Sequence, residues 1–406
     1  MKLLLSAYAC EPNKGSEPGV GWNWALALLD RGYAVHVITR SNNRPAIERV
    51  LQVQHSSMVV SYYDLPLWMR SWKHWPGGIY LYYLLWQFGA CRLARRLHAI
   101  EHFNCVQHIT FASVRQPSFM GVLGIPFIFG PVGGGETMPA QFQRGIPLAG
   151  RISETIRNLG NALLSFDPFV QFTLSRACII ACTTSETLAR IPVRFRPRCL
   201  VQPAIATHEP ESTAGCAAIL PRPHFLFIGR MLYWKGLHLA LRALAEVRRT
   251  VPEARLSVIG DGPDHAWLRS VAIDAGVMDM VDWCPAIPHD QVLREYRENL
   301  ALVFPSLHDS GGMVVLEALA AGVPVICLDL GGPGEMVTSA CGIVVKSREA
   351  SEASVIESLA GAMILLATDP NHRAYLSANS VARARQMTWA NAVEAVYSSL
   401  IDFIAH

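Results

Sequence analysis

Short apolar runs alternate with longer amphipathic stretches along most of the chain. In the first half these runs predict strands, because parallel strands that are buried on both faces are continuously apolar. The strands predicted here are Lys2–Ala9, Tyr33–Thr39, Val59–Tyr63, Val106–Thr110, Phe127–Phe129 and Ala177–Cys182. Helical patterns cover Trp22–Asp30 and Ile79–Leu97. Strands that alternate with helices indicate βαβ units and a parallel sheet.

The same alternation starts again in the second half. The strands predicted there are Phe225–Ile228, Arg255–Gly260, Leu300–Phe304 and Val323–Leu328, and the helices are Leu237–Thr250, Gly312–Ala321, Ala350–Thr368, Ala374–Arg385 and Trp389–Ile404. We therefore predict an α/β fold with two Rossmann-like domains, 1–205 and 206–388, and a closing helix over 389–406. Ligands of such sheets bind at the carboxyl ends of the strands, so two facing domains would form a cleft.

Composition narrows the class of protein. A chain of 406 residues, 51% hydrophobic and 17% charged, can form two domains with real cores and is not a disordered chain. No apolar run reaches the ~18–20 residues of a membrane-spanning helix. The 10 cysteines form neither a CxxC pair nor a Cys/His cluster, which favours reduced thiols and a cytoplasmic location. The opening MKLLLSAYAC is interpreted as a strand, because its apolar run is too brief for a signal peptide.

The net charge of +3 conceals a difference between the halves. Residues 1–203 contain 20 Lys and Arg against 10 Asp and Glu, whereas residues 204–406 contain 15 against 22. One interpretation is drift in surface composition. The other is that the first half contacts an anionic surface such as a membrane, and Trp68, Trp72 and Trp75 beside Arg70 and Lys73 suit a lipid headgroup boundary. No nucleic-acid-binding motif accompanies the positive charge.

The segment richest in candidate chemistry is residues 306–337. Asp309 follows a predicted strand, Gly311 and Gly312 open a helix, and Glu317 lies inside that helix. The glycines leave the N–H groups of the first helical residues, which include Met313 and Val314, open to a ligand. A helix N-terminus with free N–H groups binds phosphate, so Glu317 could accept hydrogen bonds from a ribose and Asp309 from a sugar hydroxyl. By itself, Glu317 could equally be an ordinary acid near a helix start.

A second candidate site follows the first predicted strand of the second half. Gly229, Arg230 and Lys235 occur in the sequence IGRMLYWKGL, which places two cations five residues apart in a loop. The planar guanidinium and the compact ammonium group both suit a diphosphate. The alternative is a solvated loop with incidental cations.

The N-terminal sequence GSEPGVGW is a candidate phosphate loop through Gly15, Gly19 and Gly21. It does not fit a dinucleotide-binding fingerprint, because position 24 is Trp and the second strand ends in Thr39 and Arg40 rather than in an acid. This poor fit argues against an NAD cofactor. There is no Asp-x-Asp pair, so we also expect no metal-dependent nucleotide site.

Taken together, the acid-x₇-acid spacing from Asp309 to Glu317, the Arg230 and Lys235 loop and the N-terminal Gly-rich loop resemble a known family. They are similar to the retaining GT-B glycosyltransferases of the "glycosyl transferases group 1" family, over essentially the whole chain. The resemblance implies a hexosyltransferase-type enzyme. In that family the acceptor binds in the N-terminal domain and the nucleotide-sugar in the C-terminal domain. The reaction takes place in the cleft, without metal, and the closing helix packs on the N-terminal domain.

The family roles can be carried over residue by residue. Arg230 and Lys235 match the pair that neutralises the diphosphate, and Glu317 matches the acid that holds the ribose. Asp309 matches the acid near the donor sugar, which is usually Glu. Residues 310–313, Ser-Gly-Gly-Met, differ from the usual Ser-Phe-Gly-hydrophobic run, although Gly312 keeps the glycine position.

The N-terminal roles are carried over in the same way. The loop from Gly15 to Gly21 matches the loop that closes on the donor phosphate and the acceptor. Many members have a His after the strand that here reads PFIFGPVGGG, and this chain has none there. His108 is the nearby candidate for a catalytic histidine, and the alternative is a structural His at a strand end.

We therefore expect a glycosyltransferase that moves a sugar from a nucleotide-diphosphate sugar to a glycan or a lipid-linked acceptor in cell-surface polysaccharide biosynthesis, such as that of lipopolysaccharide or exopolysaccharide. The donor is a substrate, and no cofactor is expected. The expected location is the cytoplasm, with possible peripheral contact at the inner face of the membrane. Two alternatives remain: a sugar-nucleotide epimerase of the same fold, and a non-catalytic scaffold that binds a glycan or a partner.

Overall fold

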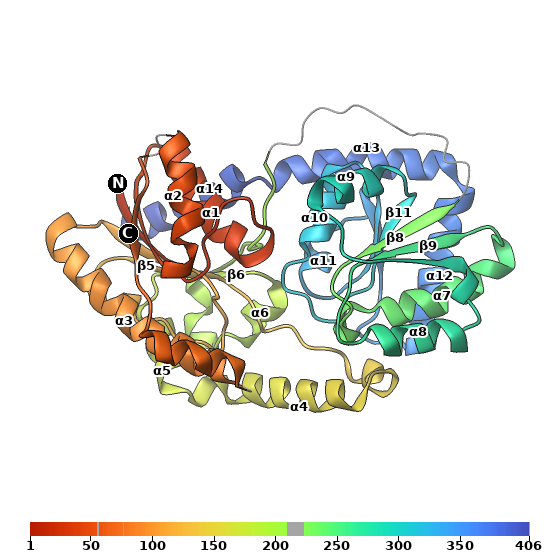
Figure 1. Ribbon diagram of the computed structural model, residues 1–406, viewed down its shortest axis with the longest axis horizontal. Coiled ribbons are helices and arrows are strands. Elements are labelled where there is room, and N and C mark those ends of the chain that lie inside the picture. The colour runs from red at the N-terminus through yellow and green to blue at the C-terminus, as the bar shows by residue number, and fades with distance from the viewer. Residues whose placement is uncertain (55–56, 76, 209–222, 406) are drawn as a thin grey trace. The chain divides into compact units, whose positions relative to one another are not determined.

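The computed structural model describes residues 1–54, 57–75, 77–208 and 223–405 (Figure 1). These residues form two compact units, each built on a parallel sheet. The first unit contains residues 1–135, 159–206 and 389–406, and the second contains residues 136–158 and 207–388. The predicted boundary at 205/206 therefore misses one segment that crosses between the units, because residues 136–158 belong to the second unit. The closing helix belongs to the first unit.

The sheet of the first unit has seven strands in the order β3-β2-β1-β4-β5-β6-β7, and every pairing is parallel. Its strands are β1 (Lys2–Ala7), β2 (Ala34–Thr39), β3 (Val59–Tyr62), β4 (Cys105–Thr110), β5 (Phe127–Val132), β6 (Ile179–Cys182) and β7 (Cys199–Val201). Its helices are α1 (Ser16–Asp30), α2 (Arg44–Gln54), α3 (Gly78–Glu101), α5 (Pro168–Arg176), α6 (Ser185–Arg190) and α14 (Trp389–Ala405).

The sheet of the second unit has six parallel strands in the order β10-β9-β8-β11-β12-β13. They are β8 (His224–Ile228), β9 (Arg255–Ile259), β10 (Val281–Cys284), β11 (Ala301–Phe304), β12 (Val325–Leu328) and β13 (Gly342–Val345). The helices are α7 (Leu237–Thr250), α8 (His265–Asp274), α9 (His289–Arg297), α10 (Met313–Ala320), α11 (Gly331–Met336), α12 (Glu352–Thr368) and α13 (Pro370–Gln386). Helix α4 (Leu148–Leu163) begins in the second unit and ends in the first.

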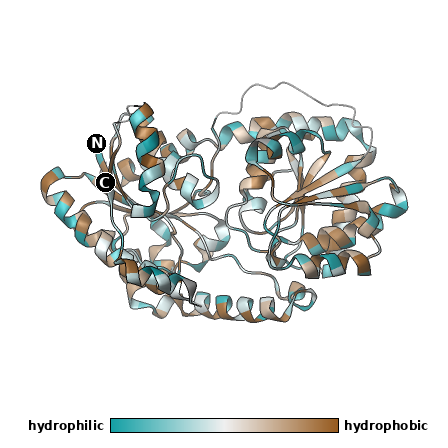
Figure 2. Ribbon diagram, viewed as in Figure 1, coloured by the Kyte–Doolittle hydropathy of each residue, from teal (hydrophilic) through white to brown (hydrophobic). Residues whose placement is uncertain are grey.

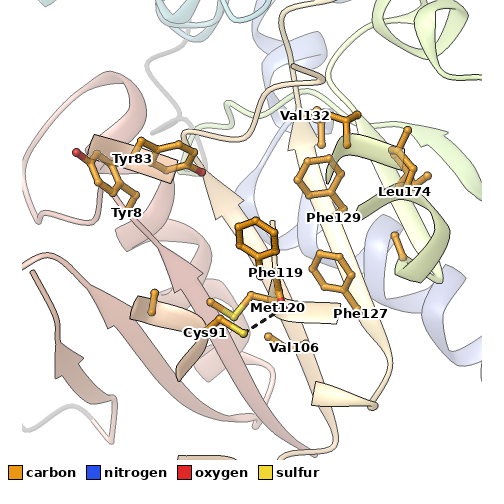
Figure 3. Close-up of a cluster of buried hydrophobic side chains, with 14 of the residues drawn as sticks. Tyr8, Tyr83, Cys91, Val106, Phe119, Met120, Phe127, Phe129, Val132 and Leu174 are labelled. Atoms are coloured by element: carbon orange, nitrogen blue, oxygen red, sulfur yellow. Dashed lines mark hydrogen bonds between the residues drawn. The ribbon is translucent and has the colours of Figure 1, made fainter. Parts of the chain in front are cut away.

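The core of the first unit is rich in aromatic rings. Figure 3 shows Tyr8, Tyr83, Phe119, Phe127 and Phe129 among the buried side chains that pack over the sheet. The rings of Tyr8 and Tyr83 meet edge to face with centroids 4.9 Å apart. Such rings bury a large apolar area each, and edge-to-face pairs contribute further stabilisation. In the second unit the central strands β8 and β11 are largely apolar and buried, as Figure 2 shows, whereas the central strand β4 of the first unit also buries polar side chains.

A polar cluster ties helices α1 and α14 to the first sheet. Gln107 on β4 is fully buried, and its Oε1 accepts hydrogen bonds from Trp24 Nε1 at 3.0 Å and from the Tyr397 hydroxyl at 2.8 Å. Its Nε2 donates to the Gly130 carbonyl at 2.8 Å. Each polar group of this amide is therefore paired, which is the condition for burying it without a large cost.

The start of α1 differs from the expectation. The sequence predicted a glycine loop up to about residue 21, but the helix begins at Ser16 and includes Gly19 and Gly21. A Cβ atom at Gly19 would lie 2.1 Å from the Lys14 carbonyl oxygen, and one at Gly21 would lie 2.3 Å from that of Ala9. These two glycines therefore let the first turns of the helix pack against the chain that precedes it.

Candidate functional site

The candidate site of the second unit lies where its strand order reverses. Strands β8 and β11 are neighbours at the centre of the sheet, and the chain leaves them towards different sides. In open α/β sheets this switch point, at the carboxyl ends of the strands, is where ligands bind. The loop after β8 carries Arg230 and Lys235, and the loop after β11 carries Asp309.

These two loops are bound closely to each other. The backbone N–H of Leu307 donates to the Trp234 carbonyl at 2.8 Å, and the Ser306 hydroxyl donates to the same oxygen at 3.1 Å. Gly236 ends the first loop with φ of 75°, and a Cβ atom there would lie 1.8 Å from the Pro305 carbonyl oxygen. Only glycine fits this approach, and it fixes Lys235 beside the end of β11.

Lys235 and Asp309 meet in an ion pair between the loops. Lys235 Nζ contacts Asp309 Oδ2, and both side chains are mostly buried. The ammonium group also lies 5.2 Å from the centroid of the Phe304 ring. Arg230, by contrast, is exposed, and within the described chain it has no acidic side chain within ion-pair distance. The site thus contains one cation with a partner and one that is open to solvent.

The loop from Asp309 to Gly312 leads directly into α10. Gly312 takes a left-handed conformation with φ of 84°, and no side chain caps the helix. The N–H of Gly311 donates to Asp309 Oδ1 at 3.3 Å, whereas the backbone N–H groups of Met313 and Val314 have no acceptor among the described residues. The first turn of a helix leaves such donors unpaired, so they can receive an anion here.

Glu317 lies one turn further along α10 in a half-buried position. Its Oε2 accepts a hydrogen bond from the Tyr296 hydroxyl at 3.0 Å, and its Oε1 lies 3.9 Å from His289 Nδ1. Burial raises the pKa of Glu317 above its usual value, although His289 and Tyr296 act in the opposite direction. Tyr296 also donates to the Val314 carbonyl at 3.1 Å, so it positions the acid relative to the start of the helix.

The sequence analysis missed a buried carboxylate beneath this site. Glu154, on α4, is almost completely buried, and its Oε1 accepts from the Tyr233 hydroxyl at 2.8 Å and lies 2.9 Å from His308 Nε2. Although burial opposes ionisation, the hydrogen bonds from His308 and Tyr233 and the charge of Arg157 lower the pKa of Glu154. Tyr233 and His308 lie close in sequence to Lys235 and Asp309, so one carboxylate holds both loops.

Other contacts anchor the segment that carries Glu154. Gln141 Nε2 donates to the Ser347 carbonyl at 2.8 Å. A Cβ atom at Gly150 would lie 3.1 Å from the Tyr233 ring, so the glycine brings α4 close to that ring. The ring of Trp234 stacks on His308 with centroids 5.5 Å apart. No sequence motif marks Glu154, because its partners are about 80 and 150 positions away in the chain.

The N-terminal candidates lie in the first unit. Gly15 precedes α1 in an extended conformation, and its neighbourhood is open, because a Cβ atom there would meet nothing within 4 Å. Gly19 and Gly21 are buried within the helix. Glu17 Oε2 accepts from the Phe111 N–H at 2.8 Å, and burial raises the pKa of Glu17. Of the three glycines, Gly15 is therefore the one that stands open to a ligand.

His108 lies inside the first unit, on β4. Its side chain is 1% exposed, and Nε2 lies 2.8 Å from the Tyr83 hydroxyl. Burial lowers the pKa of His108 to about 3, so the imidazole is neutral at physiological pH. This environment favours the structural alternative, because a catalytic base must reach the proton that it removes.

The tryptophan cluster lies in the first unit, around the 3₁₀ segment Leu67–His74. Trp68 and Trp75 are exposed, whereas Trp72 is half-buried and contacts both rings, at centroid distances of 5.5 Å and 6.4 Å. Lys73 Nζ lies 3.9 Å from the centroid of the Tyr82 ring.

Within the described chain, no single helix is long and apolar enough to cross a membrane, and the bent pair α12 and α13 meets that test only by length and composition.

Comparison with known proteins finds a family model that matches part of the chain. Residues 218–383 match the model of the family described as "Glycosyl transferases group 1". A D-inositol 3-phosphate glycosyltransferase from Acidothermus cellulolyticus is 34% identical over 190 residues, which cover 44% of this chain and 41% of that protein. The chain thus spans about two fifths of the length of that relative.

Solved structures extend the similarity to both units. The apo form of the lipopolysaccharide outer core galactosyltransferase WaaB has a TM-score of 0.62 at 13% identity and covers 99% of each chain. The Anabaena protein HepE, in complex with UDP and glucose, has a TM-score of 0.61 at 14% identity and also covers 99% of each chain. At this level of identity the likeness establishes the GT-B fold, which confirms the predicted fold class.

Proposed function

Because residues 218–383 match the model of the glycosyl transferases group 1 family, we propose that the protein is a glycosyltransferase that uses a nucleotide-diphosphate sugar as donor. We assign it a retaining, metal-independent mechanism of hexosyltransferase type. The proposed acceptor is a glycan or a lipid-linked precursor of a cell-surface polysaccharide. The protein would act in the cytoplasm, with peripheral contact at the inner face of the membrane.

One observation supports the donor site most strongly. At the switch point of the second sheet, the cations Arg230 and Lys235 lie in one loop, and the next loop leads to the unpaired N–H groups at the start of α10. Glu317 lies within the same short helix. Cations and free N–H groups suit a diphosphate, and a half-buried carboxylate suits a ribose diol. This combination fits a nucleoside diphosphate better than a simple phosphate.

The proposed reaction requires these residues to stabilise negative charge. When a sugar leaves a nucleotide diphosphate, negative charge builds up on the leaving phosphate. Arg230, Lys235 and the N–H groups of α10 would stabilise that charge without rearrangement, which is how preorganised groups lower a barrier. In the resembled family the donor phosphate assists deprotonation of the acceptor hydroxyl, and we propose the same here. The neutral, buried His108 is not needed for this route.

Asp309 adds a feature that the sequence did not predict, because its carboxylate binds Lys235. A diphosphate would therefore compete with Asp309 for the ammonium group. Replacing Asp309 by Asn should strengthen binding of a nucleoside diphosphate, since it removes both the competitor and a negative charge. The same change should slow transfer if the carboxylate contacts the donor sugar.

Thermal-shift measurements with UDP, GDP, ADP and inorganic pyrophosphate test the donor site. A ligand that binds the folded state raises the melting temperature as its concentration exceeds the dissociation constant. We expect one nucleoside diphosphate to stabilise the protein, and Glu317→Ala to abolish most of that shift while leaving the smaller shift by pyrophosphate. Glu357→Ala, an exposed acid on α12, is the matched control. If no nucleoside diphosphate stabilises the wild type at millimolar concentration, the proposed donor site is incorrect.

Product analysis separates the alternatives. A transferase releases nucleoside diphosphate only slowly without an acceptor, an epimerase converts the nucleotide-sugar with no acceptor, and a scaffold leaves the donor intact. Activity should survive EDTA, and the product should keep the anomeric configuration of the donor by NMR. Activity restored only by Mg²⁺ or Mn²⁺, or an inverted product, would refute the proposed mechanism.

A further inference from the structure

Helix α4 has its apolar and polar faces in the reverse of the usual arrangement. Leu148, Ile152, Ile156, Leu159 and Leu163 are all between 51% and 70% exposed. Its buried positions include Gly150, Glu154 and Asn161. A helix on a globular protein normally turns its apolar stripe inward and its polar residues outward. Figure 2 shows hydrophobic residues recurring along this helix.

The exposed residues form a continuous stripe. Their spacings of 4, 4, 3 and 4 positions place them within a sector of about 80° at ~100° per residue, and the 16-residue helix is about 24 Å long at ~1.5 Å per residue. Isolated exposed apolar side chains need no explanation. Within the described chain, α7 has no large apolar side chain among the exposed ones, and α8, α12 and α13 have one each. Helix α3 has four, Tyr80, Leu81, Phe88 and Ile100, but they are spread over about 200° of the helix and do not follow one face.

The charges around the stripe have one sign. Glu154 is the only acid of α4, and it is buried against Tyr233 and His308. Arg151 is exposed beside the stripe, and Arg144 is exposed in the segment just before the helix. Arg151 Nη2 also donates to the Arg144 carbonyl, at 2.6 Å, which holds the two residues together. The ionic groups that this helix and its approach expose are therefore cationic.

We propose that this outer stripe of α4, residues Leu148, Ile152, Ile156, Leu159 and Leu163, is a membrane-contact surface that lies in the headgroup region of an anionic bilayer. An amphipathic helix with apolar residues on one face and Arg at its flank binds in the interface plane. The alternative occupant is a second copy of this chain. Pairing two stripes would bring Arg144 and Arg151 of both copies together without an exposed acid on α4 to compensate, whereas lipid phosphates compensate them directly.

This inference rests on the proposed function, because it names the surface that would make the proposed membrane contact. The contact itself does not require that the protein transfers a sugar. The surface also differs from the one that the sequence suggested, which was the tryptophan cluster at Trp68, Trp72 and Trp75. Because the inner face of α4 holds the loops of Lys235 and Asp309 through Glu154, the same helix would join the bilayer to the donor site.

Vesicle co-sedimentation tests the surface. Wild-type protein should pellet with mixed phosphatidylcholine–phosphatidylglycerol vesicles and less with phosphatidylcholine alone. Ile152→Ser/Ile156→Ser should weaken binding to the mixed vesicles roughly tenfold or more, since two apolar side chains lose their burial in lipid. Arg151→Glu should reduce the preference for anionic vesicles. Ile273→Ser/Val193→Ser, at exposed apolar positions elsewhere, is the control and should bind as wild type does.

Two further measurements keep the outcomes separate. The thermal shift by a nucleoside diphosphate should be unchanged in the Ile152→Ser/Ile156→Ser variant, so a loss of vesicle binding with an intact shift supports the surface alone. If that variant binds vesicles as tightly as the wild type, or only Trp68→Ser/Trp75→Ser abolishes binding, the proposal is overturned. A wild-type dimer that dissociates in the Ile variant by light scattering, with no vesicle binding, would assign the stripe to self-association instead.

Discussion

The carboxyl ends of the central strands differ between the two sheets, although both sheets reverse their strand order at the same place. In the first unit, two charged groups near this edge bind backbone: Arg40 Nε donates to the Tyr8 carbonyl at 2.9 Å, and Glu17 accepts from Phe111 N–H. In the second unit, Lys235 binds Asp309, and Arg230 is exposed without an acidic partner among the described residues.

This difference shows how one topology supports two uses. Charges that bind backbone atoms stabilise a loop, and a ligand could engage them only by breaking that bond. A cation in contact with solvent can take an anionic partner at low cost, and a cation paired with a carboxylate can exchange it for a ligand phosphate that supplies the same charge. We therefore expect substitutions at the second switch point to alter catalysis more than stability. Substitutions of buried polar groups in the first unit should do the reverse.

The largest expected loss of stability concerns Glu154, a buried carboxylate that holds the two loops of the second switch point. Glu154→Ala leaves the Tyr233 hydroxyl and His308 Nε2 without an acceptor, and each such group costs about 1–3 kcal/mol. Chemical denaturation should show a loss of roughly 2–5 kcal/mol, with Glu357→Ala as control. Because the pKa of Glu154 is lowered by folding, its contribution is complete above the usual carboxyl range and is lost as the pH falls through the lowered value. An unchanged midpoint would mean that other contacts hold these loops.

Arg230→Ala tests whether the open cation serves catalysis. It should lower kcat about 10²–10³-fold, because one preorganised charge contact to the leaving group is lost. Its unfolding free energy should change by at most about 1 kcal/mol, since the side chain is exposed. Steady-state kinetics decide, with the exposed Arg294→Ala as control. An unchanged kcat with only KM raised would show that Arg230 holds the donor but does not accelerate the reaction.

Gln107→Leu tests whether a buried polar group of the first unit affects stability more than catalysis. The change leaves Trp24 Nε1, the Tyr397 hydroxyl and the Gly130 carbonyl without their partner. We expect a loss of about 2–3 kcal/mol in the unfolding free energy, with kcat of the remaining folded protein within about twofold of wild type. Tyr397→Phe removes one bond of the three and should cost less. A large fall in kcat without loss of stability would contradict the contrast between the units.

The smallest expected effect is a dependence of stability on pH from two buried histidines. Burial lowers the pKa of His108 and of His238 to about 3. The unfolded chain takes up these protons below about pH 6.5, so stability is complete above that value and decreases as the pH falls towards 3. From pH 7 to pH 5 each histidine should cost up to about 2 kcal/mol.

The two histidines should respond differently to substitution. His108 is bonded to Tyr83, whereas neither ring nitrogen of His238 has a partner among the described residues. His238→Leu should therefore flatten the pH profile without a loss of stability at pH 7, while His108→Leu should flatten it at a cost. Equal pH profiles for His238→Leu and wild type, measured by thermal denaturation, would show that the neutral form is not favoured there.

The sequence predicted the alternating plan because strands such as Lys2–Ala7 and His224–Ile228 contain apolar runs, Leu3–Leu5 and Phe225–Ile228, and each strand is followed by a loop and a helix. It missed β7, β10 and β13, which have three or four residues: β7 and β13 are apolar but too short to give a pattern, and Asp282 interrupts β10. It also placed the start of α1 about six residues late, because glycines were interpreted as a loop where they serve close packing.

The candidate site was predicted in part. Arg230, Lys235, Asp309 and Glu317 could be named because they sit in local motifs after strands. The pairing of Lys235 with Asp309, and the role of Tyr296 beside Glu317, depend on how separate loops meet. Glu154 could not be found from the sequence, since nothing nearby in the chain indicates that α4 buries an acid.

The chain passes from one unit to the other four times, after residues 135, 158, 206 and 388. Two of these passages lie side by side, because the Thr207 N–H donates to the Met387 carbonyl at 3.0 Å. A chimaera made by joining the first half of this protein to the second half of a relative would therefore carry the wrong version of two segments, residues 136–158 and 389–406. Domain exchange would have to graft the first of these segments together with the second unit and leave the second segment behind.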